Sequence, residues 1–394
     1  MPPPQPSRHV LLILLSAAAL PVALSGVMLG PLLVALANAF QTSVAMVGQL
    51  AAATALTWGI TAPLAGPVSD VYRRRLMLLT GLLLMAWGLL GSVLAWNYGS
   101  LLACRLLTGV GGAMVPPNII AMIAEVFPPE GRGQAMGWVL SATGLSAALG
   151  VSLVAGLLGV GGWRLPFAVV GTAALGVWLL LWVWCPRSPR PSGQAFVFFA
   201  HYREIGSHGT VWSVLAANAL QQMILSGVFG YLAAYLMQTY HLPAGDTALP
   251  LVFAGVGIIV GGFLGGRVAD HRRRLAVFAM ACVGSGLLAA LVFTLRVSPW
   301  ATVALAFGVA GLARVSSVVT PTVLLELAGT SRTTATGVFA VSNQLGAFGG
   351  ASLGGLMLAL GGFSLVGLFC LGVAVLAAVV IRLTVRDSAH ASPR

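Results

Sequence analysis

The sequence predicts an all-α polytopic membrane protein, with twelve transmembrane helices in two parallel-repeat six-helix bundles. Three observations predict this fold class: a very apolar composition, recurrent apolar segments of bilayer length, and a sequence pattern that returns after 200 residues. The 394 residues are 58% hydrophobic and 7% charged, with a mean hydropathy of +0.97. A membrane span needs about 20 mainly apolar residues, whereas a β-barrel has roughly 10-residue alternating segments, which this sequence lacks.

Apolar segments long enough to cross a bilayer follow one another along the whole chain. The longest polar interruption, residues 186–209, is expected to be a cytoplasmic linker between an N-terminal bundle at 1–185 and a C-terminal bundle at 210–394. The first segment resembles a secretory signal, but its apolar run continues to about residue 35, which favours an uncleaved first helix. The predicted spans are 11–36, 46–67, 76–96, 100–124, 134–160, 165–185, 210–238, 247–268, 275–295, 299–326, 334–359 and 363–384.

Arginine placement predicts the orientation, because basic residues favour the cytoplasmic side. All 20 basic residues are Arg. Sixteen of the 20 fall in cytoplasmic segments if the N-terminus is inside, and two, Arg164 and Arg296, fall in outer loops. We therefore expect a plasma (inner) membrane protein with both termini in the cytoplasm. Clusters between apolar runs, rather than a basic patch on a soluble face, argue against nucleic acid as a partner.

An internal repeat underlies the division into two bundles. Residues of the first half recur 200 or 201 positions later: Gly66, Asp70, Glu125, Arg132 and Gly137 return as Gly266, Asp270, Glu326, Arg332 and Gly337. Parallel repeats of this kind are typical of secondary transporters, whose substrate site lies near the bilayer midplane between the halves.

Three motifs resemble those of the major facilitator superfamily. Residues 66–75, GPVSDVYRRR, resemble the family's loop Gly-x-x-x-Asp-Arg-x-Gly-Arg-Arg/Lys, with Val71 and Arg73 as departures. Residues 105–112, RLLTGVGG, resemble the family's Arg-x-x-Gln-Gly, with Thr108 in place of Gln. The triplet GWR at 162–164 is common in the twelve-span drug and metabolite exporter branch. The resemblance implies the major facilitator fold and secondary transport by alternating access.

One exporter motif is reduced. The branch carries Gly-Pro-x-x-Gly-Gly in its fifth helix, and the corresponding residues here, GVSLVA at 150–155, keep only the first Gly. The resemblance therefore does not extend to the motif associated with antiport.

The resemblance also implies a cytoplasmic gate, in which charged pairs hold the halves together when the site faces outward and separate in the other state. The alternative is that these arginines only anchor the topology. The gate candidates are Asp70, Arg73, Arg74, Arg75, Glu125, Arg132, Asp270, Arg273, Glu326 and Arg332.

Two arginines fall within predicted spans, where charges are costly and usually mark a pathway. Arg105 lies about six residues below the outer surface and can snorkel there, whereas Arg314 lies about 14 residues, or roughly 21 Å, into its helix. Arg314 is expected to meet an anionic or polar ligand, the alternative being a structural role on helix ends or carbonyls. Uncharged polar and aromatic groups at mid-span suit an amphipathic ligand or act as interhelical bonds. The cavity candidates are Arg314, Arg105, Ser25, Trp58, Trp138, Asn218, Gln221, Gln222, Tyr231, Tyr235, Asn343 and Gln344.

Acids and histidines are missing from mid-membrane. None of the eight acids or six His falls there, which argues against a strongly cationic substrate. If protons drive transport, the candidates for the titrating group are Glu125 and Asp246. The four Cys show no metal-ligand spacing, and neither a cofactor nor a metal is expected.

The sequence thus favours a monomeric secondary active transporter that exports small amphipathic or weakly anionic organic compounds. Its expected partners are a small-molecule substrate and the lipid bilayer, and coupling to protons stays an open alternative. An importer or facilitator of an organic anion or sugar is the second interpretation. A membrane-embedded enzyme would need a nucleophile or metal site at a membrane face, and the sequence shows no such constellation. A transport-dead receptor would normally add a soluble output domain.

Overall fold

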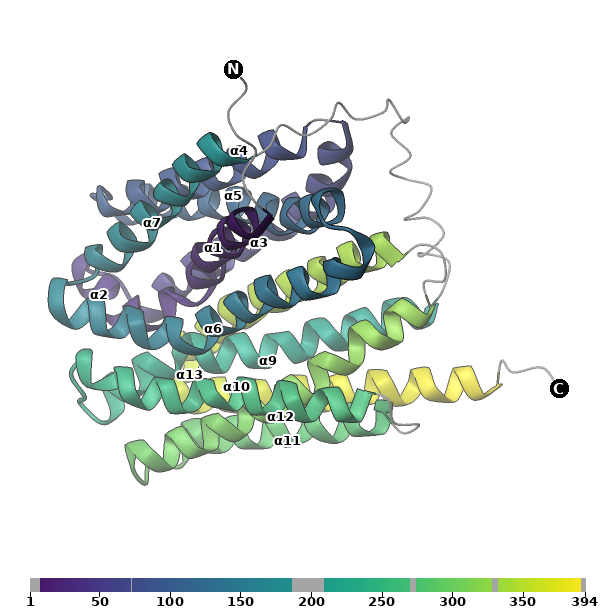
Figure 1. Cartoon of the computed structure of the whole chain (residues 1–394). Coiled ribbons are helices and arrows are strands. Elements are labelled where there is room, and N and C mark those ends of the chain that lie inside the picture. The colour runs from purple at the N-terminus through teal and green to yellow at the C-terminus, as the bar shows by residue number, and fades with distance from the viewer. Residues whose placement is uncertain (1–7, 72, 186–208, 270–273, 328–331, 391–394) are drawn as a thin grey trace, which may run out of the picture.

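The computed structural model describes residues 8–71, 73–185, 209–269, 274–327 and 332–390, and within them every regular element is a helix (Figure 1). The N-terminal helices are α1 (Arg8–Val27), α2 (Leu29–Ala39), α3 (Val44–Val71), α4 (Arg74–Val93), α5 (Tyr98–Val126), α6 (Pro129–Gly161) and α7 (Arg164–Trp184). The C-terminal helices are α9 (Gly209–Thr239), η1 (Gly245–Thr247), α10 (Ala248–Ala269), α11 (Arg274–Thr294), α12 (Pro299–Leu327) and α13 (Arg332–His390).

Twelve spans are present in the described ranges. Ten helices are long and apolar enough to cross a bilayer, and α6, bent by 43° near its middle, makes an eleventh. Helix α13 comprises two spans, because Gly361 and Gly362 leave the helical conformation within its 59 residues. This confirms the predicted fold class, and the predicted ends fall within a few residues of those observed.

Proline and glycine explain the breaks. Between α1 and α2, Pro31 lacks the N–H that would bond the carbonyl of Val27, so the helix is interrupted at Met28. Gly362 has φ +70°, a left-handed conformation that glycine adopts without a Cβ penalty. Gly162, which separates α6 from α7, has the same φ of +70° and lies 200 residues earlier.

The helices repeat with that same offset. α1 and α2 together (8–39) correspond to α9 (209–239), α4 (74–93) to α11 (274–294), and α5 (98–126) to α12 (299–327). The packing repeats as well: α3 packs on α5 as α10 packs on α12, and α4 packs on α7 as α11 packs on the last part of α13. The sequence repeat is therefore a structural repeat.

The two sets of helices meet along a shared seam. Helix α3 packs against α13, α6 against α10, and α2 against α9 (Figure 1). The domain boundaries at 185 and 210 stay a prediction, because residues 186–208 of the expected linker lie outside the described residues.

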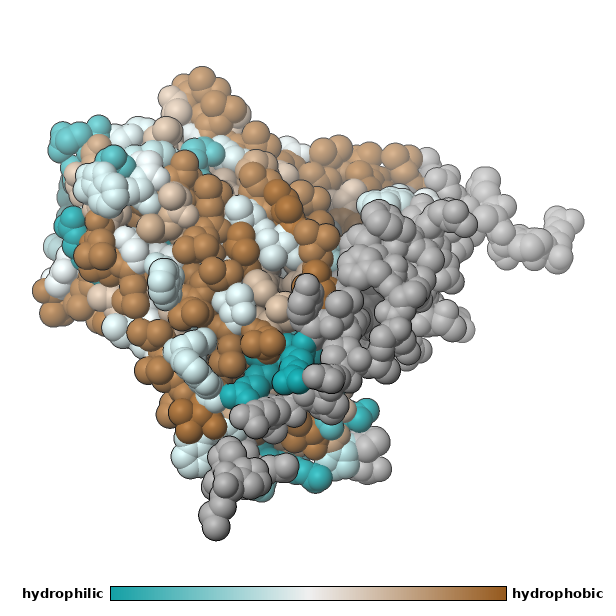
Figure 2. Space-filling model, turned by 90° about the horizontal axis from the view of Figure 1, so that it is seen from above, coloured by the Kyte–Doolittle hydropathy of each residue, from teal (hydrophilic) through white to brown (hydrophobic). Residues whose placement is uncertain are grey.

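Apolar side chains cover much of the visible surface in Figure 2, where brown residues extend over the helical face. Large apolar residues with half or more of their surface exposed occur in both sets of helices, including Ile13, Trp87, Val183, Phe263 and Leu368. Such a surface suits the hydrocarbon of a bilayer.

Candidate substrate cavity

A cavity of about 510 Å³ lies between the two sets of helices. Its walls come from α1, α2, α3, α5 and α6 on one side and from α9, α10, α12 and α13 on the other. Most of the lining is apolar, and no described lining residue is an acid or a histidine. The polar and aromatic lining residues are Ser25, Thr54, Trp58, Thr143, Gln222, Ser226, Phe229, Tyr231, Arg314 and Gln344.

The two sets of helices touch at the end of the cavity remote from the start of α1, where a Cβ on Gly159 of α6 would lie 3.1 Å from the Gly245 backbone of η1. There the hydroxyl of Tyr231 on α9 donates to the carbonyl of Ala351 on α13 (2.6 Å). The side-chain amide of Gln49 on α3 donates to the carbonyl of Ser352 (3.1 Å), and this second bond joins α3 to α13. Gly48 of α3 leaves room for the Tyr231 ring, since a Cβ at residue 48 would collide with its hydroxyl. We call these residues the closed end.

Arg314 supplies the positive charge of the cavity. It projects from α12, is partly buried, and its Nε atom is buried without a hydrogen-bond partner. No hydrogen bond or ion pair joins its guanidinium to another described residue. A buried cation without a protein partner is costly, so the arrangement favours an anionic ligand or water at this point.

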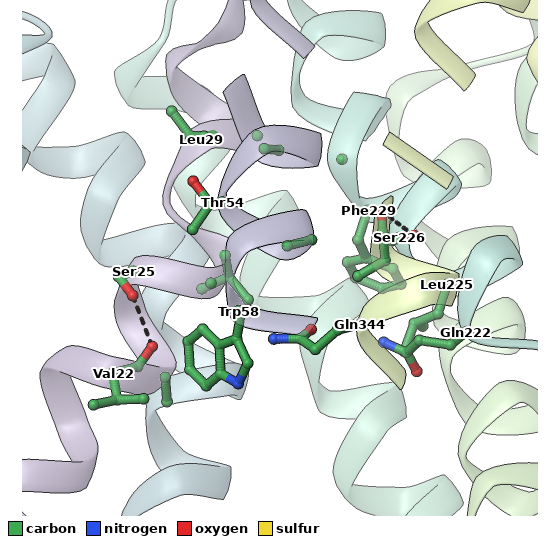
Figure 3. Close-up of a pocket in the computed structure, with 18 of the residues that line it drawn as sticks. Val22, Ser25, Leu29, Thr54, Trp58, Gln222, Leu225, Ser226, Phe229 and Gln344 are labelled. Atoms are coloured by element: carbon green, nitrogen blue, oxygen red, sulfur yellow. Dashed lines mark hydrogen bonds between the residues drawn. The ribbon is translucent and has the colours of Figure 1, made fainter. Parts of the chain in front are cut away.

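Trp58, Gln222 and Gln344 extend the recognition surface. Figure 3 shows Trp58 and Gln344 projecting into the space between α1 and α9, with Gln222 beyond them. Trp58 fits because Gly112 of α5 has no side chain; a Cβ there would lie 2.7 Å from the indole ring. An aromatic wall beside side-chain amides suits a ligand with an apolar body and a few polar groups.

Sequence reasoning missed several lining residues, of which Thr54, Ser226 and Phe229 are visible in Figure 3. Thr54 lies four residues before Trp58, and Ser226 four residues after Gln222. Since residues four apart share a helix face, extending each predicted position by one turn would have found both.

Other candidates hold helices together. Asn218 of α9 donates to Ser342 Oγ (2.7 Å) and Asn343 Oδ1 (2.9 Å) of α13. Gln221 donates to the carbonyl of Ala313 (2.9 Å) and accepts from Ser317 Oγ (2.8 Å), both on α12. These residues make the interhelical bonds that the sequence left as the alternative.

Two aromatic candidates also lie outside the cavity lining. Tyr235 is fully buried and packs edge-on against Phe293, Phe363 and Tyr240 at ring distances of 5.1–5.9 Å. Trp138 is 60% exposed and is not among the lining residues, although its neighbours Met136 and Val139 are.

Arg105 differs from the expectation of a cavity or snorkelling residue. It is fully buried within the N-terminal helices, where it donates to Ser92 Oγ (2.9 Å) and the Gly88 carbonyl (3.4 Å) of α4. Its guanidinium lies 4.9 Å from the centre of the Phe167 ring of α7. The charge is held by a hydroxyl, a carbonyl and an aromatic face, so Arg105 ties α4, α5 and α7 together.

The first gate cluster is partly described. Arg74 Nη1 lies 2.8 Å from Glu125 Oε1, which joins the start of α4 to the end of α5. Arg75 instead donates to the carbonyl of Trp182 on α7, and Arg132 donates to the carbonyl of Phe127 (3.0 Å). Arg73 is exposed just before α4.

The remaining gate candidates are Asp70, Asp270, Arg273, Glu326 and Arg332, whose side chains lie outside the described residues. Asp246, the second proton-coupling candidate, is exposed in η1 near the closed end. Among the described residues, no group of three or more His, Cys, Asp or Glu is placed to hold a metal ion.

The sequence profile of the Major Facilitator Superfamily matches residues 15–327 and 247–394. The chain belongs to the major facilitator superfamily. It is therefore an integral membrane protein of a family of small-molecule transporters, and the resemblance seen in its motifs is confirmed.

Two relatives within this superfamily align with most of the chain. A 3-(3-hydroxy-phenyl)propionate transporter of Escherichia coli is 29% identical over 337 residues, covering 83% of this chain and 81% of its own length. A probable sugar efflux transporter of Helicobacter pylori is 26% identical over 339 residues, covering 82% of each chain.

The fold also matches a solved structure. A bacterial homologue of the human lysosomal transporter Spinster, in an inward-facing and occupied conformation, superposes with a TM-score of 0.77. The two chains are 18% identical, and the match covers 97% of each. It confirms the major facilitator fold.

Proposed function

We propose that this protein is a secondary active transporter that exports small, amphipathic, weakly anionic organic compounds by alternating access. The substrate class we favour is the monocarboxylate with an apolar, preferably aromatic, body. Arg314 takes the carboxylate, Gln222 and Gln344 bind its polar substituents, and the apolar walls and Trp58 enclose the body.

Arg314 is the observation that carries this proposal. Its guanidinium lines the cavity without a described protein partner, and no described lining acid competes for it. An Arg fork matches the geometry of a carboxylate and forms two parallel, charge-assisted hydrogen bonds with it. Since Arg314 is the one cation among the described lining residues, the cavity favours a ligand with a single negative charge.

The relatives support the substrate class and the direction separately. The E. coli relative is named for an aromatic carboxylate, and the H. pylori relative for efflux. In the present state α3 and α13 are hydrogen-bonded across the seam at the end remote from the start of α1, which supports closure there. If the termini are cytoplasmic, as the arginine distribution predicts, a substrate enters this state from the cytoplasm.

Transport in proteoliposomes tests the proposal. The purified protein should move radiolabelled 3-phenylpropionate faster than it moves the neutral analogue 3-phenylpropionamide, whereas protein-free liposomes should show no such difference. Sorting the orientation with a tag-specific protease then gives the preferred direction. Equal transport of the acid and the amide would contradict the substrate class, and transport only toward the side of the termini would contradict export.

A further inference from the structure

A second hollow, of about 450 Å³, lies between α4 and α7, on the side of the N-terminal helices that faces away from the C-terminal helices. Its lining is Arg73, Arg75, Leu76, Leu79, Thr80, Leu83, Trp178 and Trp182. None of these residues lines the substrate cavity. We call this hollow the Arg–Trp groove.

The polar groups of the groove gather at one end. Arg73 and Arg75 lie at the start of α4, while Leu83 lies ten residues, or roughly 15 Å, further along that helix. On α7, which runs the opposite way, Trp182 lies two residues before the helix ends. The groove therefore runs from a basic, aromatic rim to an apolar interior, as a lipid runs from headgroup to acyl chain.

Several hydrogen-bond donors in the groove have no acceptor among the described residues. The Trp178 indole N–H and the Arg75 Nε are buried without a partner, and no described residue pairs with Arg73. The α4 N-terminus adds to this, because no side chain caps its free N–H groups, and such a terminus favours an anion. Arg75 uses one nitrogen on the Trp182 carbonyl, which orients its guanidinium across the groove.

The groove faces away from the rest of the protein. Leu76 is 52% exposed and Trp182 is 56% exposed. Leu179 and Leu180 of α7 each expose about half of their surface. Trp178 and Trp182 pack edge-on with ring centres 4.8 Å apart. Tryptophan at the level of lipid headgroups and arginine beside it are the usual composition of a membrane interface.

We propose that the Arg–Trp groove binds an anionic phospholipid. Arg73 and Arg75 bind the phosphate from either side, the Trp178 indole donates to a headgroup or ester oxygen after a small side-chain adjustment, and one acyl chain lies along Leu76, Leu79 and Leu83. The net positive charge of the rim selects an anionic headgroup over a zwitterionic one.

The arginine triplet then serves two partners. Arg74 binds Glu125 of α5 toward the inside of the bundle, while Arg73 and Arg75 face the lipid. This explains why three consecutive arginines stand at the start of α4, where the helix dipole alone would disfavour a positive charge.

Native mass spectrometry of the full-length protein in detergent tests the proposal, with titration of phosphatidylglycerol, phosphatidylcholine and inorganic phosphate. Phosphatidylglycerol should bind at least tenfold more tightly than phosphatidylcholine, and phosphate should not displace it. Arg73→Gln/Arg75→Gln should weaken phosphatidylglycerol binding about 25-fold, from roughly fivefold for each arginine near an anionic lipid. Trp178→Phe keeps the ring, removes the N–H and should weaken binding severalfold.

The matched control removes the same charge elsewhere. Arg8 and Arg382 are both exposed, at the start of α1 and near the end of α13, and Arg8→Gln/Arg382→Gln should leave the affinity within twofold. The proposal is overturned if both double variants lose binding equally, if phosphatidylcholine binds as tightly, or if phosphate alone competes. Should the Arg73/Arg75 variant fail to fold, an undiminished affinity in Trp178→Phe would count against the groove.

Discussion

The two arginines within membrane spans, Arg105 and Arg314, should respond in opposite ways to the same substitution. Arg314→Gln removes a guanidinium that bonds no described residue, so the melting temperature of the ligand-free protein should stay the same or rise. Arg105→Gln removes the two hydrogen bonds to α4, a longer one to the Met28 sulfur, and the contact with the Phe167 ring. The ligand-free protein should therefore lose stability.

The magnitudes follow from these contacts. A hydrogen bond to a charged group contributes about 1.5–3 kcal/mol, so Arg314→Gln should weaken binding of an aromatic carboxylate roughly 10- to 150-fold. The Arg105→Gln substitution loses hydrogen bonds of that strength and a desolvated cation–π contact of about 2 kcal/mol. Part of this loss in stability is offset, because the substitution also removes a charge that costs about 2.5–3.5 kcal/mol within a span. We expect a net destabilisation of about 1.5–5.5 kcal/mol.

Thermal-shift titration of both variants with 3-phenylpropionate and 3-phenylpropionamide measures both effects. Arg314→Gln should abolish the preference for the acid and leave the amide little affected, while Arg105→Gln should lower the ligand-free melting temperature and keep the preference. Equal losses for the acid and the amide in Arg314→Gln, together with a lower melting temperature, would make Arg314 a structural residue.

Three further predictions concern the gate, the closed end and the topology. Glu125→Gln should change folding stability by less than about 1 kcal/mol, because its pair with Arg74 is partly exposed, yet slow transport severalfold at unchanged binding affinity; an unchanged rate would reduce the pair to a topology anchor. Gly48→Ala should push Tyr231 away and lengthen spin-label distances between α3 and α9 at the closed end, and unaltered distances would mean that the contact does not hold this state. Tags at both termini should be reachable only from the cytoplasm, and a periplasmic C-terminus would contradict the assigned orientation.

Much of the fold could be predicted because local chemistry decides it. Apolar length fixes each span, and glycine at 162 and 362 marks the same turn in both repeats. The break between the last two predicted spans is likewise local, because Gly361 and Gly362 leave the helical conformation there.

The site was harder to predict because helix rotation decides it. Gln221 and Gln222 are neighbours, but successive residues point about 100° apart around a helix, so Gln221 bonds α12 while Gln222 lines the cavity. Asn343 and Gln344 divide in the same way. Both members of each pair are polar, so the sequence carries no signal for which one faces the ligand.

The same limit applies to the arginines. The partners of Arg105 come from α4 and α7, 13 residues before it and 62 after it in the sequence. Only tertiary packing brings Ser92 and Phe167 to it, so the sequence could identify a costly buried charge but not its compensation.

The position of a bound carboxylate tests the central claim most directly. A cryo-electron microscopy structure with 3-phenylpropionate should place the carboxylate at about 2.7–2.9 Å from the Arg314 guanidinium nitrogens, with the phenyl ring toward Trp58. A carboxylate held elsewhere, with Arg314 bonded only to protein carbonyls or water, would contradict the assignment of Arg314 as the anion-binding residue of this transporter.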